Sequence, residues 1–375
     1  MDDRPILHLV RGLEFGGMER VVLDLARASR RLGHDHRIVT YDVPPGGPGQ
    51  FESDGIDVTY IERGAGVDLE FARRLREHIA RTRPAAVHAH GDSAAFYLGI
   101  ASLGFRGQPP RTVATFHAWP SHATWRGRWA TRVSAARLDM RTAVSEELRE
   151  RLERVGWVRR VTVVPNGVDT ARFKPGRCAA ALALRRELGV GPNDRLVVHA
   201  GRFDPIKRHE DLLDAAQKLA AATPRVVVAC VGTGPEFDRL KPRIDALPHV
   251  RALGERRDMD VVWRAADVAC LCSDHEGTPM SLLEALSSGV PAVATDVGGI
   301  RALLDGNGRL VPPRRPDLLA ASVAEVCGAS PLDTKRWKEA SRERVCEFEL
   351  ARTAEHWASV YRNTGPPPPR GPAPA

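Results

Sequence analysis

Two glutamates eight positions apart, Glu276 and Glu284, lie on either side of a predicted helix start. An apolar strand and a loop come first, and Pro279 followed by an apolar run predicts a helix from Met280. A helix start leaves backbone N–H groups without intrahelical partners, and the helix dipole makes that end attractive to anions. The amides concerned are those of Met280, Ser281 and Leu282. A ligand with both phosphate and sugar hydroxyls fits this segment; the alternative is two solvated glutamates at a helix end.

Two cations follow another predicted strand, at 196–200. Gly201 lets the chain turn at the end of this strand, so Arg202 and Lys207 should lie at the carboxyl edge of a sheet. In open α/β sheets this is the edge at which ligands bind. A guanidinium fork and an ammonium point charge suit a diphosphate.

A third segment with the same chemistry lies near the amino terminus. A strand at 6–10 is followed by Gly16 and Gly17 and by a helix from about Met18. Paired glycines let the backbone approach a ligand, and the helix start again attracts anions. A glycine pair alone is explained as well by loop geometry, but three segments with one chemistry favour a phosphate ligand.

The composition is that of a globular protein with two domains. Of the 375 residues, 43% are hydrophobic and 27% are charged. Single cores stop growing at roughly 250–300 residues, so the chain should divide. No stretch approaches the roughly 20 apolar residues of a membrane helix, and the acidic start is unlike a signal peptide. The six cysteines form no CxxC pair, and we expect reduced core residues in a cytoplasmic protein.

The formal net charge of +8 favours anionic partners. Ten arginines lie within 126–160, with Trp119, Trp125, Trp129 and Trp157 in or near this range. Two interpretations stay open: a face that rests on anionic lipid, which would make the protein peripheral at the inner membrane face, or an arginine-rich helical surface without a partner. Nucleic acid is not expected as a partner, because no aromatic-studded sheet or groove-reading motif occurs.

Strands and helices alternate along the chain, which predicts an α/β protein with parallel sheets covered on both faces. The predicted strands are 6–10, 36–41, 57–61, 86–90, 112–115, 140–143 and 161–164, then 196–200, 225–231, 250–253, 268–272, 291–295 and 308–311. The predicted helices are 19–31, 69–82, 94–103 and 146–155, then 209–222, 235–246, 259–265, 280–287, 300–304 and 316–328. A linker is expected at 169–176. A Pro-rich tail at 364–375 should be disordered.

The chain resembles the retaining glycosyltransferases of family four, which have the GT-B fold of two Rossmann-like domains facing across a cleft. The matching segments are GLEFGGMERVVLDLA (12–26), TFHAWP (115–120), AVSEELRERL (143–152), VVPNGVDTARF (163–173), HAGRFDPIKRHEDLLDA (199–215), VGTGPEFDRL (231–240) and HEGTPMSLLEALSSGVPAVATDVGG (275–299). They span nearly the whole chain. The resemblance implies an acceptor domain at 1–172, a nucleotide-sugar donor domain at 177–348, and a final helix at 350–362 that returns to the first domain.

The resemblance also implies roles for the site residues. Glu284 would bind the ribose hydroxyls, Arg202 and Lys207 the diphosphate, and Glu276 a hydroxyl of the transferred sugar. His117 would contact the donor sugar and help to orient the reaction. The amides of Met280 to Leu282 and those of Gly16 and Gly17 would complete the phosphate cradle. Thr278 stands where the family often has a bulky apolar residue, which bears on sugar preference.

Enzymes of this family are expected to react on one face of the sugar, with the acceptor proton passing to the departing phosphate. This needs cations near the phosphate and no bound metal. Asp258 and Asp260 superficially match a metal-binding triplet, but they precede a predicted helix and are interpreted as caps. On the acceptor side the candidates are Glu19, His90 and Asp92, each explained equally well as a cap or a partnered buried group. Residues 119–129 could form a flap over lipid or acceptor.

The sequence therefore predicts a hexosyltransferase that moves a hexose or N-acetylhexosamine from a UDP- or GDP-sugar to a glycan or lipid-linked acceptor. The GGMERVVLDLA opening resembles exopolysaccharide and lipopolysaccharide assembly enzymes. A nucleotide-sugar epimerase of the same architecture and a non-catalytic nucleotide-sugar-binding partner are the alternatives.

Overall fold

The structure is a computed structural model that describes residues 4–13, 16–42, 55–119, 125–155, 158–222 and 225–362. The chain divides into two compact units. Unit 1 is Met1–Gly167 with Leu350–Ala375, and unit 2 is Val168–Glu349. The tail predicted to be disordered lies outside the described residues.

Unit 1 is built on a sheet of seven parallel strands. They are β1 (Ile6–Val10), β2 (His36–Thr40), β3 (Asp57–Tyr60), β4 (Ala86–His90), β5 (Arg111–Phe116), β6 (Met140–Ala143) and β7 (Val161–Val163), in the order β3-β2-β1-β4-β5-β6-β7. The helices are α1 (Gly17–Arg31), α3 (Leu69–Thr82), α4 (Asp92–Ser102), α5 (Trp125–Ala135), α6 (Glu146–Arg154) and α15 (Leu350–Arg362).

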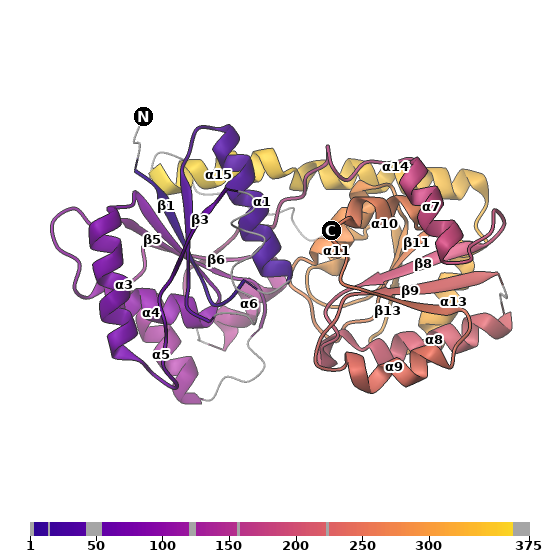
Figure 1. The fold of residues 1–375 in the computed structure, drawn as a ribbon, viewed down its shortest axis with the longest axis horizontal. Helices are drawn as coiled ribbons and strands as arrows, with labels where there is room; N and C mark the ends of the chain where they lie inside the picture. The colour runs from indigo at the N-terminus through magenta and orange to yellow at the C-terminus, as the bar shows by residue number, and fades with distance from the viewer. Residues whose placement is uncertain are drawn as a thin grey trace. The chain divides into compact units, whose positions relative to one another are not determined.

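Alternating strand residues send side chains to opposite faces of this sheet, and each face has its own core. Leu7, Leu9 and Val87 pack with α3, α4, α5 and α6. Ile6 and Ala86 point the other way and pack with Leu25 of α1 and with α15. Figure 1 shows α3, α4 and α5 on one side of the sheet and α1 and α15 on the other. The last helix thus covers a face of the first sheet.

Unit 2 repeats the design with six parallel strands. They are β8 (Arg195–Ala200), β9 (Val226–Val231), β10 (Val250–Gly254), β11 (Val268–Leu271), β12 (Ala292–Thr295) and β13 (Gly308–Val311), in the order β10-β9-β8-β11-β12-β13. The helices are α7 (Ala179–Glu187), α8 (His209–Ala222), α9 (Phe237–Asp245), α10 (Met259–Ala265), α11 (Met280–Ser287), α12 (Ile300–Leu303), α13 (Pro316–Cys327) and α14 (Pro331–Val345), with short 3-10 turns η1 (Pro205–Lys207) and η2 (Cys346–Phe348).

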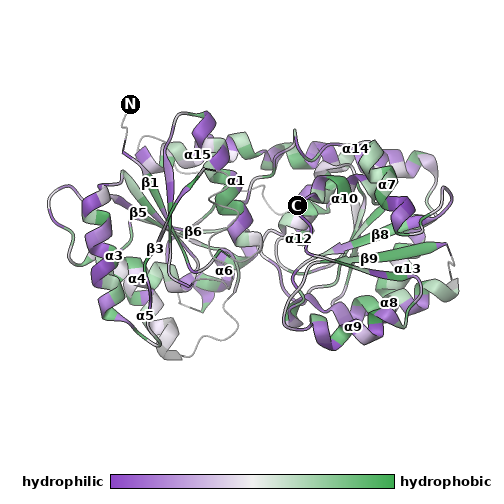
Figure 2. Cartoon of the chain, in the orientation of Figure 1, coloured by the Kyte–Doolittle hydropathy of each residue, from purple (hydrophilic) through white to green (hydrophobic). Residues whose placement is uncertain are grey.

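Helices α8, α9 and α13 pack against one face of the second sheet. Helix α11 contacts β11 and β12 and contributes no residue to that core, and α10 and α14 both contact α11. In Figure 2, β8 and β9 are coloured as hydrophobic, whereas α9 shows both hydrophilic and hydrophobic residues. This is the pattern of strands buried on both faces under amphipathic helices. The prediction of an α/β protein with two parallel sheets is confirmed.

Three helices, α5, α7 and α14, have no counterpart among the predicted elements. Only two residues of α14, Ser341 and Val345, are buried. A helix with so few buried positions needs few apolar residues, so its sequence lacks the apolar periodicity that predicts a helix. Residues 169–176, expected as a linker, begin with a turn in which the Asp169 carboxylate accepts from the amides of Ala171 and Arg172. Phe173, in the same segment, is fully buried.

All six cysteines are free thiols. Cys230, Cys270, Cys272 and Cys327 are buried as expected, but Cys346 is exposed. None of the helices in the described ranges combines the length and hydropathy that a bilayer crossing requires.

Candidate functional site

The predicted donor residues of unit 2 lie on the segments that follow two neighbouring strands, β8 and β11, where the strand order changes direction. Strand β8 has β9 as its neighbour on one side and β11 on the other, so the chain continues to opposite sides of β8 after these two strands. At such a switch point the loops that leave two neighbouring strands diverge, which opens a place for a ligand at the carboxyl edge. The loop after β8 carries Arg202 and leads to Lys207 in η1, and the loop after β11 carries Glu276.

Lys207 and Glu276 are joined although 69 positions separate them. The Lys207 ammonium donates to Glu276 Oε1 at 2.6 Å, and the Ser273 hydroxyl donates to the same oxygen at 2.6 Å. The Glu276 side chain is 8% exposed and that of Lys207 is 26% exposed. The carboxylate is therefore held by a cation and a hydroxyl, and the Lys207 side chain is partly exposed. The two loops are also tied by the Asp274 amide, which donates to Ile206 O at 2.8 Å.

The loop that contains Glu276 packs tightly against the turn after β12. Gly298 has φ +58°, and a Cβ there would lie 1.8 Å from Glu276 O. The Gly299 amide donates to Gly277 O at 3.0 Å. Because neither the conformation nor the space admits a side chain, Gly298 positions the backbone that carries Glu276.

Gly298→Ala should therefore displace the Glu276 loop or cost at least about 2 kcal/mol more than the same change at a glycine with free space. Gly306 supplies that control, because it has φ +73° and a Cβ added there would meet no atom within 4 Å. The measurements are the free energy of unfolding in urea and the affinity for UDP. Equal stability and equal affinity of the two variants would contradict this packing argument.

Helix α11 begins where the sequence predicted, with Pro279 at the N-cap position. The Leu282 amide already donates to Pro279 O at 3.1 Å, so it is less available to a ligand than expected. Met280 and Thr278 are each 8% exposed, whereas Ser281 is half-buried. The amino end of α11, where an anion would bind, therefore directly follows the loop that carries Glu276.

Glu284, one turn into α11, is held by a residue that the sequence prediction missed. The indole N–H of Trp263 donates to Glu284 Oε2 at 3.1 Å. Trp263 is fully buried in α10, and Glu284 is 6% exposed. A buried carboxylate with a fixed donor keeps one orientation. No sequence signal joins the two, since α10 and α11 come together only through the fold.

Arg202 is exposed, on a loop that packs against the turn after β9. The Phe203 amide donates to Thr233 O at 2.8 Å, and Gly232, with φ +126°, would place a Cβ 2.3 Å from Gly201 O. The guanidinium is thus carried by a rigid backbone.

Behind this loop lie two buried imidazoles. His199 Nδ1 lies 2.8 Å from Cys270 O, and the His209 ring stacks on Phe203 with centroids 3.8 Å apart. Burial lowers the pKa of His199 to about 4 and that of His209 to about 2. Both rings are therefore neutral at pH 7.

In unit 1, Gly16 is the N-cap of α1 and Gly17 its first residue. A Cβ at Gly16 would lie 2.4 Å from Glu19 Oε2, so this carboxylate folds back over the helix start. Asp92 occupies the first turn of α4, after Gly91 with φ +88°. Glu19 and Asp92 are both half-buried.

His117 follows β5, and its Nε2 lies 3.0 Å from Nδ1 of His90. His90 Nε2 lies in turn 3.0 Å from His8 Nδ1, so both nitrogens of His90 are engaged with other imidazoles. Burial lowers the pKa of His117 to about 4. His90 and His117 also line a cavity of about 20 Å³ beside Trp357 of α15.

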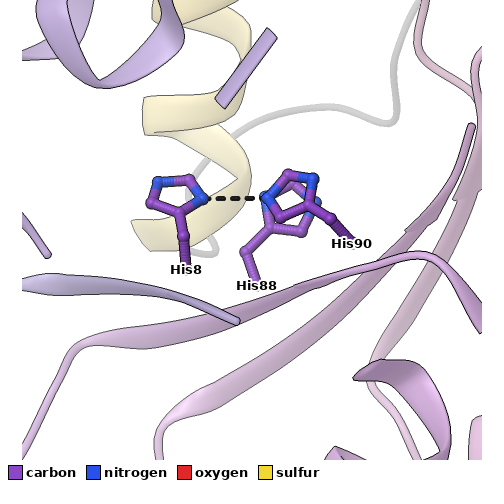
Figure 3. Close-up of side chains that lie close together, drawn as sticks. All are labelled: His8, His88 and His90. Carbon is purple, nitrogen blue, oxygen red and sulfur yellow. Dashed lines mark hydrogen bonds between the residues drawn. The ribbon is translucent and has the colours of Figure 1, made fainter. Parts of the chain in front are cut away.

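His8, His88 and His90 bring ring nitrogens within 4.8 Å of one another, which is the one such cluster among the described residues (Figure 3). Zinc bonds of about 2.0–2.1 Å would require nitrogens roughly 3.3 Å apart. Each ring already has hydrogen-bond partners, and those of His88 are Tyr361 OH at 2.7 Å and Thr115 Oγ1 at 2.6 Å. The cluster is therefore best described as a hydrogen-bonded network.

The Asp258–Asp260 triplet lies at the start of α10, as predicted. Asp258 is at the N-cap position, but its side chain makes no cap hydrogen bond, so the expected capping contact is wrong. Instead its carboxylate accepts from Arg256 at 2.8 and 2.6 Å, and Asp260 pairs with Arg172 at 3.2 Å.

The arginine-rich region 126–160 shows internal pairing on its described side chains. Arg149 pairs with Glu146 and Glu153. Arg151 lies 4.3 Å from the ring centre of Trp119, and this tryptophan packs on the core. Trp129 is 64% exposed, next to Val133 at 41%. Residues 120–124 of the predicted flap, and Trp157, lie outside the described residues.

Family models match both units. Residues 15–172 match Glycosyltransferase Family 4, and residues 194–328 match Glycosyl transferases group 1.

Two curated relatives are among the most similar. The phosphatidyl-myo-inositol mannosyltransferase of Mycolicibacterium smegmatis is 30% identical over 362 residues, which cover 92% of this chain and 90% of the relative. The D-inositol 3-phosphate glycosyltransferase of Geodermatophilus obscurus is 35% identical over 250 residues, which cover 60% of this chain. The chain spans about half of that relative's length, at 52%.

Among solved structures, Anabaena HepE in complex with UDP superposes with a TM-score of 0.80 at 22% identity, over 96% of this chain and all of HepE. HepE has also been solved in complex with UDP-glucose, with a TM-score of 0.83 and 23% identity to this chain, covering 96% of it and 99% of HepE. At these identities the likeness shows the fold, which is GT-B.

Proposed function

Because the chain belongs to the family-four glycosyltransferases, we propose that it transfers a hexose or N-acetylhexosamine from a nucleotide diphosphate sugar to a glycan or lipid-linked acceptor, with retention at the sugar carbon. The observation that carries this proposal is the Lys207–Glu276 pair at the switch point of the second sheet. It puts a cation for phosphate beside a carboxylate for sugar hydroxyls, which are the two chemistries of a nucleotide sugar.

Lys207 is suited to the diphosphate in its present arrangement. An ammonium has three N–H donors, and the bond to Glu276 uses one of them. The others, with Arg202 and the first amides of α11, would bind phosphate oxygens and stabilise the charge that grows on the leaving group. Glu276 would meet a hydroxyl of the transferred sugar, and Thr278 would border the same pocket.

Glu284 would accept from the ribose hydroxyls, because a carboxylate oxygen has room for more than one donor and Trp263 fixes the group in place. His117 would contact the donor sugar, and Gly16 and Gly17 would add backbone donors for phosphate. Glu19 and Asp92, in the first turns of α1 and α4, are the proposed acceptor contacts. His90 would contribute through its bond to His117.

The proposed reaction takes place on one face of the sugar. The bond from the anomeric carbon to the phosphate oxygen breaks, the acceptor oxygen bonds from the same side, and its proton passes to the departing phosphate. The cations at Arg202 and Lys207 stabilise the departing charge, so we propose that the reaction needs no metal.

We propose that the donor is a UDP-sugar and that UDP is the leaving group, because HepE, with the same fold, binds UDP and UDP-glucose. A GDP-sugar is the alternative. The names of the relatives point to inositol-containing or lipid-linked acceptors. Trp129 and Val133, exposed on the basic α5 region, would be the contacts of a peripheral membrane interaction.

The test is incubation with UDP- and GDP-sugars, with and without EDTA. We expect slow release of UDP by hydrolysis, at the same rate in EDTA. Interconverted sugars with intact nucleotide would identify an epimerase instead, and the absence of a thermal shift with every nucleotide would contradict donor binding. Loss of activity in EDTA would overturn the metal-independent mechanism alone.

A further inference from the structure

Four imidazoles in unit 1 form a continuous hydrogen-bonded chain across four strands, here called the imidazole chain. His36 Nδ1 lies 2.8 Å from His8 Nε2, His8 Nδ1 lies 3.0 Å from His90 Nε2, and His90 Nδ1 lies 3.0 Å from His117 Nε2. Figure 3 shows the central bond, between His8 and His90. His36 begins β2 and His117 follows the end of β5, so the chain runs from the amino edge of the sheet to the carboxyl edge.

Strand register puts these rings on one face. Ile6 pairs with His36 and with Ala86, so residues of the same parity on β2, β1 and β4 point the same way. This is the face that α15 covers, where the Tyr361 ring meets those of His8 and His36 edge-on. Adjacent rings of the imidazole chain stand with centroids 5.0–5.3 Å apart.

Three members of the imidazole chain are shielded from water, and His117 is half-buried. His36, His8 and His90 are 1%, 0% and 2% exposed. Burial lowers the pKa of His36 to about 3, and it lowers those of His8 and His90 well below the ordinary value. With His117 also neutral, each ring carries one proton at pH 7.

Counting these protons leaves two arrangements. Every link joins an Nδ1 to an Nε2, and a neutral ring has one N–H and one acceptor nitrogen. If His8 carries its proton on Nδ1, its Nε2 must accept from His36 Nδ1. His8 Nδ1 then donates to His90 Nε2, so His90 is protonated on Nδ1 and donates from there to His117 Nε2. All four rings are then protonated on Nδ1, or, in the reverse order, all four on Nε2.

We propose that His36, His8 and His90 determine the tautomer of His117 at the carboxyl edge through the three hydrogen bonds of the imidazole chain. The first arrangement leaves His36 Nε2 as an acceptor and His117 Nδ1 as a donor, and the second reverses both. Each ring holds one proton in either arrangement, so the net charge is the same. His117 thereby presents Nδ1 either as a donor or as an acceptor.

This inference rests on the proposed function, in which His117 contacts the donor sugar. His36, His8 and His90 are then positioning residues: they act through His117 and touch no substrate. The arrangement decides whether His117 donates to a sugar oxygen or accepts from a sugar hydroxyl.

His88 is the matched control. It is as buried as the members of the imidazole chain, at 1% exposure, and lies two residues from His90 on β4. Its nitrogens pair with Tyr361 OH and Thr115 Oγ1, outside the imidazole chain. It makes no hydrogen bond to a member of the imidazole chain among the bonds of the described residues.

The test is a long-range ¹H–¹⁵N correlation spectrum of the full-length protein labelled in histidine, in which the shifts of both ring nitrogens report the tautomer. We expect His36, His8, His90 and His117 to show one common tautomer. In His8→Phe, His117 should change to the other tautomer or to a mixture, and kcat should fall about tenfold at unchanged UDP affinity. In His88→Gln, His117 should keep its wild-type signals.

Opposite tautomers among the four wild-type rings would overturn the proposal, and so would an unaltered His117 in folded His8→Phe. If that variant does not fold, the wild-type spectrum decides. One equivalent of metal that co-purifies and is lost in His88→Gln would also overturn it, in favour of a metal centre. Because the spectrum needs no substrate, its outcome is independent of whether UDP is released.

Discussion

Lys207→Ala should lower kcat for sugar transfer or UDP release roughly 10²–10³-fold, as loss of a single group that stabilises transition-state charge does. The ammonium would neutralise the phosphate most strongly when the leaving group carries its full charge, so the rate should suffer more than UDP affinity. The variant also leaves the Glu276 carboxylate, 8% exposed, with Ser273 but without its cation. Lys207→Arg should recover part of the rate. Steady-state kinetics and calorimetric titration with UDP measure the two effects.

Arg314→Ala is the matched control for that experiment. Arg314 pairs with Asp274 of the same loop, but its side chain is 69% exposed. Exposed pairs contribute about 0–1 kcal/mol, so this change should leave kcat within about twofold. Equal losses in the two variants would show that the loop is being disturbed, and a wild-type rate in Lys207→Ala would refute the charge-stabilisation account.

Stability should fall steeply as the pH drops below about 6.5. Burial lowers the pKa of ten imidazoles in the described part of the chain. The seven with the largest shifts are His8, His36, His88, His90, His117, His199 and His209. The unfolded chain binds these protons near pH 6.5 and the folded chain does not. As the pH is lowered from 6.5 towards the pKa of the folded state, each group therefore reduces the free energy of unfolding by about 1.4 kcal/mol per pH unit.

His209→Phe tests this linkage with little loss of contact. Among the described residues neither nitrogen of His209 has a hydrogen-bond partner, and its ring stacks on Phe203. Burial lowers the pKa of His209 to about 2. Between pH 8 and pH 5, the free energy of unfolding should therefore fall by roughly 2 kcal/mol less in the variant than in wild type. Comparing each protein with itself at two pH values removes the effect of repacking. Identical pH dependence would contradict a buried, neutral His209.

The sequence predicted those parts of the donor site that depend on residues close together in the chain. Apolar strand, loop and helix signals placed α11 at 280–287, where it lies, and the eight-residue spacing identified Glu276 and Glu284. The bond from Lys207 to Glu276 was not predictable in the same way, because it depends on β8 and β11 being neighbours. The resemblance supplied the roles, and the strand order supplies the contact.

The residues that hold the site residues were missed for the same reason. Trp263 lies within the predicted helix 259–265, and only the packing of α10 on α11 brings its N–H to Glu284. His8 and His90 follow apolar residues in their strands, and His36 begins its strand beside Arg37. This pattern does not show which strands are neighbours, and so it does not show that the three rings meet. Helix α14 was missed because it has so few buried positions.

The most direct measurement of the central claim is a crystal structure of the full-length protein with UDP. The account predicts diphosphate oxygens within hydrogen-bond distance of Lys207 Nζ and of the Arg202 guanidinium, with the ribose hydroxyls on Glu284. A diphosphate bound away from these two cations, or an ammonium of Lys207 that meets Glu276 and no phosphate oxygen, would contradict it.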